Sequence, residues 1–134
     1  MERFTNNRAR RLIVDGERVC VEMPALVLLP GSDVFEPLWR LRGVEVTSIS
    51  GVEYACFKPR SRVVVRSGRG WGRRGGDSYY IVEPGGGHRR LAKRPVKTLE
   101  GVWLVALVDR ATGEVIYTRV TDRGIVVAGR EVVF

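Results

Sequence analysis

The sequence is poor in metal-binding side chains and has no long apolar stretch. Cys20, Cys56 and His88 are its only cysteines and histidine, so one chain cannot assemble a zinc, iron–sulfur or haem site of the usual ligand spacing. No apolar run approaches the roughly 18 residues of a membrane helix, and the first residues lack the apolar stretch of a signal peptide. We therefore expect a cytoplasmic protein that uses no cofactor or metal and makes no membrane contact.

Amide side chains are also scarce. Glutamine is absent, and Asn6 and Asn7 are the only asparagines, a depletion that favours a thermophilic source. An intracellular disulfide between Cys20 and Cys56 is admissible in a hyperthermophile, and the alternative is two small, buried free thiols. A chain of 134 residues can bury a core without such a crosslink, so we expect one domain over residues 1–134.

Turn residues divide the chain into short β-rich runs. Residues 10–14 and 17–23 flank Asp15-Gly16, and residues 44–49 and 52–57 flank Ser50-Gly51; both arrangements are typical of β-hairpins, the first with a type I′ turn. The remaining runs are residues 25–29, 62–66, 77–83, 102–109, 114–120, 125–128 and 131–134. Short strands with turn signals at intervals of roughly ten residues predict a mainly β, single-domain antiparallel β-barrel or β-sandwich.

One segment has a different period. Between residues 32 and 42 the apolar side chains, among them Val34, Phe35 and Leu38, recur at spacings of three and four. This spacing predicts a helix, and Pro37 restricts it to a short helix or a single turn.

The positive charge is concentrated in one part of the chain. Between Lys58 and Lys97 there are 12 basic and 2 acidic side chains, whereas the other 94 residues hold 11 basic and 13 acidic ones. Most of this surplus falls in residues 67–76 and 84–95, which are rich in glycine and arginine and are expected to be long basic loops. Residues 1–9 are expected to form a flexible basic arm.

Arginine combined with glycine and aromatic residues suits binding to a polyanion. Guanidinium groups bind phosphate oxygens, glycine lets the backbone approach closely, and aromatic rings stack on bases. We therefore predict a nucleic-acid-binding protein of low sequence specificity, with single-stranded RNA or DNA favoured over duplex. The predicted contact residues are Arg66, Arg69, Trp71, Arg73, Arg74, Tyr79, His88, Arg89, Arg90, Lys93 and Arg94.

Other interpretations of the same residues remain open. The arginines could form surface ion pairs, or the basic loops could dock an acidic partner in a ribonucleoprotein, virion or other complex, with a homo-oligomer formed through exposed β-strand edges. Gly70, Gly72 and Gly75 match a dinucleotide-binding glycine pattern, but a strand rather than a helix is predicted to follow them. His88 has no second histidine to complete an acid–base pair, so we expect no catalytic residue and no enzyme.

Overall fold

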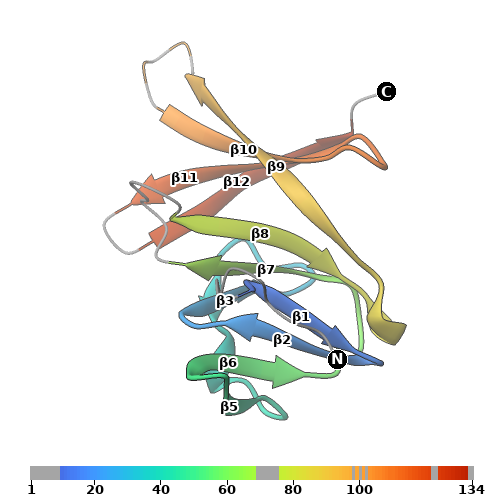
Figure 1. The fold of residues 1–134 in the computed structure, drawn as a ribbon. Helices are drawn as coiled ribbons and strands as arrows, with labels where there is room; N and C mark the ends of the chain where they lie inside the picture. Colours follow the sequence, from blue (N-terminus) through green and yellow to red (C-terminus); the bar gives the residue numbers. More distant parts are fainter. Residues whose placement is uncertain are drawn as a thin grey trace.

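The structure, a computed structural model, describes residues 10–68, 76–97, 99, 101, 103–121 and 124–132. These residues form two antiparallel β-sheets without an α-helix (Figure 1). In spatial order, the small sheet contains β1 (Leu12–Asp15), β2 (Arg18–Glu22), β6 (Val52–Phe57) and β5 (Glu45–Ile49). The large sheet contains β12 (Gly124–Val132), β11 (Glu114–Thr121), β10 (Trp103–Asp109), β9 (His88–Lys97), β8 (Asp77–Val82), β7 (Val63–Gly68), β3 (Ala25–Leu28) and β4 (Glu36–Pro37). The prediction of a mainly β, antiparallel fold is confirmed.

The large sheet is curled like half a barrel, and β7 and β8 form a wall between two cores. One face of this wall packs against the small sheet, where Val65 and Val82 meet Val19 of β2. The opposite face lines the inside of the curl, where Ile81 meets Leu107 of β10. Strands buried on both faces carry continuous apolar runs rather than an alternating pattern, which accounts for the run Val63–Val65.

Both predicted hairpins are present. Ser50 and Gly51 have φ values of 53° and 83° between β5 and β6, as a type I′ turn requires at both central positions. In the hairpin of β1 and β2 the register pairs Asp15 with Arg18, so the two-residue turn is Gly16-Glu17 rather than the predicted Asp15-Gly16.

The helix predicted between residues 32 and 42 is reduced to a three-residue 3-10 turn, η1 (Leu38–Arg40). The helical spacing of its apolar residues has another cause: Phe35 points into the core inside the curl, whereas Leu38 packs into the core between the sheets. The intervening β4 pairs with β3 at the edge of the large sheet, a position where Pro37 needs no backbone donor.

Two further predictions are corrected in the large sheet. Most of the predicted loop 84–95 is a strand. Only its first residues form a turn, the 3-10 turn η2 (Pro84–Gly86), and β9 begins at His88. The short run predicted at 125–128 and the described residues 131–132 of the run predicted at 131–134 belong to a single strand, β12, whose register against β11 shifts by a bulge next to Tyr117. The basic arm 1–9 and residues 69–75 of the other basic loop lie outside the described residues.

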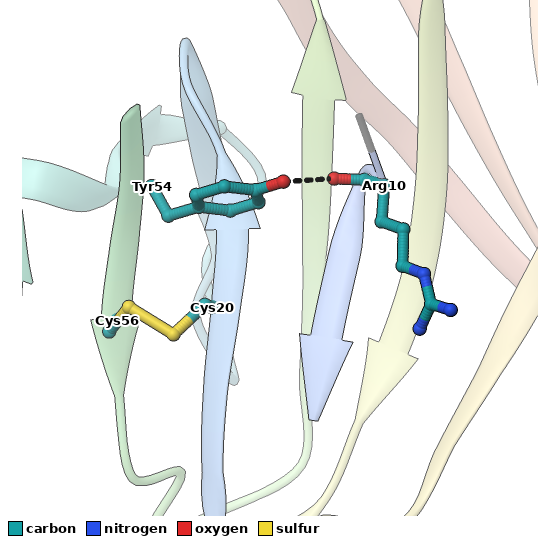
Figure 2. The surroundings of a disulfide bond; sticks show 4 residues. All are labelled: Arg10, Cys20, Tyr54 and Cys56. Carbon is teal, nitrogen blue, oxygen red and sulfur yellow. Dashed lines mark hydrogen bonds between the residues drawn. A yellow bond between two sulfur atoms is a disulfide. The ribbon is translucent and has the colours of Figure 1, made fainter. Parts of the chain in front are cut away.

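The two cysteines form a disulfide, which settles the alternative left open by the sequence. Cys20 and Cys56 are direct neighbours across β2 and β6, with their Cα atoms 4.0 Å apart. Figure 2 shows the bond beside Tyr54, whose hydroxyl donates a hydrogen bond to the carbonyl oxygen of Arg10 at 2.8 Å. The crosslink and this ring form a small apolar cluster on the face of the small sheet that points away from the shared core.

Candidate nucleic-acid interface

Strand β9 carries five of the eleven predicted contact residues, and the pleat divides them between two faces. Its first half, residues 88–91, pairs with β8, and its second half, residues 92–97, pairs with β10. Leu91 is buried in the core inside the curl. Since side chains alternate along a strand, Arg89 and Lys93 lie on the face of Leu91, and His88, Arg90 and Arg94 lie on the opposite face.

Arg89 is committed to an internal ion pair. Its Nη2 atom lies 2.8 Å from Oδ2 of Asp109 and its Nε atom 3.2 Å from Oδ1, while the Asp109 side chain is only 2% exposed. The hydrogen bonds from Arg89 hold the pKa of the Asp109 carboxyl below its usual value, against the opposing effect of burial. The backbone N–H of Ala111 donates a further bond to Oδ1 at 3.0 Å. Using Arg89 for a phosphate would leave the buried Asp109 carboxylate, among the described residues, with only the more distant cation Arg62, whose Nη2 atom lies 3.8 Å from Oδ2, and weakening the pairing of a buried carboxylate is unfavourable.

Lys93 is similarly occupied, because its Nζ atom forms an ion pair with Asp77 at the start of β8. For Arg89 and Lys93, the alternative in which the basic residues form ion pairs within the protein therefore applies. Neither is a good candidate for a phosphate contact.

The opposite face of β9 presents cations without carboxylate partners. Arg90 and Arg94 are exposed and form no ion pair within the described part of the chain. The guanidinium of Arg90 lies 6.0 Å from the centre of the Tyr80 ring, and its Nη2 atom donates to Oγ of Ser78 at 3.2 Å. These contacts orient the guanidinium and leave it charged. His88 is exposed at the end of this face, with Nδ1 3.2 Å from the carbonyl oxygen of Gly86.

Arg66 and Tyr79 lie inside the protein and cannot touch a ligand at its surface. They are cross-strand neighbours on β7 and β8, 6% and 1% exposed. Nη2 of Arg66 donates to the carbonyl oxygen of Gly68 at 3.0 Å, while Nε of Arg66 and the hydroxyl of Tyr79 have no partner within the described residues. Burial raises the pKa of Tyr79, and the neighbouring charge of Asp77 raises it further. The prediction that these two side chains contact nucleic acid is therefore not supported by their positions.

The remaining four predicted contacts, Arg69, Trp71, Arg73 and Arg74, lie outside the described residues. The sequence pattern alone favoured Tyr79 and did not single out its neighbour Tyr80. Two consecutive strand residues point to opposite faces, so only one of the two tyrosines could accompany the exposed cations. Tyr80 is that one, since it lies directly across from Arg90.

The sequence matches no protein-family model, and no curated protein or solved structure is significantly similar to it. Function therefore rests on the chemistry of the site. Within the described residues no group of three or more histidine, cysteine or carboxylate side chains could hold a metal ion. No helix in the same part of the chain has the length and apolar character needed to cross a membrane.

Proposed function

We propose that the protein binds nucleic acid, with single-stranded RNA or DNA preferred over duplex, through the face of β9 that carries His88, Arg90 and Arg94. The proposal rests mainly on one observation: Arg90 and Arg94 are exposed and unpaired with acids in the described part of the chain, whereas the cations on the opposite face, Arg89 and Lys93, are neutralised. Cations that no carboxylate of the described residues neutralises are available to a polyanion. No catalytic step is part of the proposed function.

The geometry of the strand suits an extended backbone better than a compact ligand. At about 3.3 Å per residue, Arg90 and Arg94 lie about 13 Å apart along β9, so they would meet different phosphates of one strand. Tyr80 lies beside Arg90 and is partly exposed, so a base could contact the exposed part of its ring. Phosphate contacts of this kind carry little sequence information, in keeping with low specificity.

The test is fluorescence anisotropy with labelled single-stranded RNA, single-stranded DNA and duplex DNA across a range of salt concentrations. Each phosphate contact with a single strand contributes about 0.7 to the slope of log affinity against log salt. We expect Arg90→Ser and Arg94→Ser each to lower the slope by about that amount. The control is Arg40→Ser, which removes an exposed arginine from η1 and should leave the slope unchanged.

Two results would overturn the proposal. The first is the absence of binding to all three ligands at micromolar protein and near-physiological salt. The second is an equal effect of all three substitutions, because net charge alone would then explain the binding and β9 would have no special part in it.

A second candidate function is assembly, and the position of β12 favours it. This nine-residue strand lies at one edge of the large sheet and pairs only with β11 within the described residues. A free edge of this length can accept a strand from a second chain. Molar mass from light scattering separates the two functions: an oligomer that persists at high salt without nucleic acid supports assembly, and a monomer whose mass changes only with nucleic acid supports binding.

A further inference from the structure

We propose that the cleft between the two sheets, at the end of the molecule where β6 leads into β7, binds a small organic anion with an apolar body, such as a medium-chain carboxylate. The cleft has a volume of about 630 Å³, within the range of small-molecule sites. The inference does not depend on nucleic-acid binding, since no residue of β9 lines this cleft.

The floor of the cleft is apolar because the core between the sheets is not sealed at this end. Val27, Leu38 and Val63 of the buried core line it from below. Leu41 and Phe57, which pack against this core, remain partly exposed and form its sides. Water over such a surface is displaced favourably by an apolar ligand, with a gain that grows with the apolar area covered.

The rim of the cleft is strongly cationic. Arg18, Arg42, Lys58 and Arg60 line it, and Glu45 is the one carboxylate among its lining residues. In the described part of the chain none of these four cations forms an ion pair, whereas Arg62, one residue beyond the lining residue Ser61, is paired with Glu114 at 2.7 Å. Four unpaired cations around an apolar floor are complementary to a ligand that combines a negative head group with an apolar body.

The shape and chemistry of the lining favour a small molecule over a polymer. The floor is mostly aliphatic and Phe57 is its only aromatic residue, so it offers little stacking surface for successive bases. The cations surround a concave site rather than follow a strand, unlike Arg90 and Arg94 on β9. In the proposed complex the carboxylate faces the cations of the rim, among them Arg42 and Arg60, while the chain covers the floor.

The experiment is isothermal titration of the full chain with decanoate, with decanol as the matched neutral ligand. We expect saturable 1:1 binding of decanoate, and binding of decanol weaker by about tenfold because it lacks the charge. Arg42→Ser and Arg60→Ser should each weaken decanoate binding at least about threefold. Arg40→Ser is the control, because Arg40 is exposed close by in sequence but does not line the cleft. Melting temperatures establish that each variant is folded.

Displacement of anilinonaphthalene sulfonate, a fluorescent anion with an apolar body, provides an independent measurement on the same variants. Competition by decanoate, lost in parallel in Arg42→Ser and Arg60→Ser, supports the site. The proposal is overturned if decanoate shows no saturable binding, if decanol binds as tightly, or if Arg40→Ser weakens binding as much as the two cleft variants. It is also overturned if an acidic, apolar peptide binds the cleft more tightly than decanoate, since the occupant would then be a protein segment.

Discussion

Reduction of the Cys20–Cys56 disulfide should destabilise the protein markedly. The bond closes a loop with a sequence separation of 36. In the chain-entropy model, a crosslink that closes a loop of this size lowers the entropy of the unfolded chain and so raises the free energy of unfolding by about 4 kcal/mol. A chain of 134 residues has an unfolding entropy of about 0.28 kcal/mol per kelvin near its melting temperature, so full reduction should lower the melting temperature by about 14 °C.

The assay is thermal and urea unfolding monitored by circular dichroism, with and without a phosphine reductant, after thiol titration has shown that reduction is complete. The control is the double variant Cys20→Ala/Cys56→Ala, which should unfold identically in both conditions. The urea m-value of the native sequence should rise on reduction, because the unfolded chain can then expand and expose more surface. If oxidised and reduced protein melt within about 2 °C of each other, the crosslink does not restrict the unfolded chain as this reasoning requires.

Three further predictions concern side chains at defined positions. Asp109→Asn should lower the free energy of unfolding by about 2–4 kcal/mol near neutral pH. Because the folded-state pKa of Asp109 is lowered, the carboxylate stabilises the fold above the ordinary carboxyl pKa and stops doing so as the pH falls. The free energy of unfolding from urea titrations should therefore fall less steeply in acid for the variant than for the native protein, and an equal slope would contradict this. Tyr79→Phe should change the free energy of unfolding at neutral pH by less than about 0.5 kcal/mol, since the hydroxyl has no partner among the described residues; a loss above about 1 kcal/mol would reveal a partner. Because burial raises the folded-state pKa of Tyr79, the native protein should lose stability above about pH 10, and the variant should lose less, with Tyr54, whose pKa is also raised, still contributing. Gly86→Ala should lower the melting temperature more than Gly85→Ala, because both glycines have positive φ but only a Cβ at Gly86 would collide with the carbonyl oxygen of Gly16; equal effects would show that backbone strain alone decides.

Local features of the fold were predictable from the sequence, and features that depend on distant partners were not. The Ser50-Gly51 turn fixes its own backbone conformation, so the hairpin of β5 and β6 could be predicted from two residues and the alternation around them. The Cys20–Cys56 bond depends on β2 pairing with β6, and nothing near either cysteine specifies that pairing.

In the candidate site, too, local features could be predicted from the sequence and features that depend on distant partners could not. Strand β9 was predicted as a loop because its core-facing face carries Arg89 and Lys93, so the apolar period of a strand is missing. Their charges are balanced by Asp109 and Asp77, which are distant in the sequence. Counting charges located the basic segment in the sequence but not the partners of its side chains. Which cations were free to bind a ligand could be decided only from these pairings.

The two ion pairs of β9 also connect this strand to both of its neighbours in the large sheet, β8 and β10. Arg89 lies in the half of β9 that pairs with β8, yet it binds Asp109 of β10; Lys93 lies in the half that pairs with β10, yet it binds Asp77 of β8. Each pair thus links β9 to the neighbour with which its backbone forms no ladder at that point. The junction between β8 and β10 is therefore closed by ion pairs where main-chain bonding stops. Because the Asp109 and Asp77 side chains are only 2% and 6% exposed, salt should screen these pairs weakly, and the junction should stay closed as ionic strength rises.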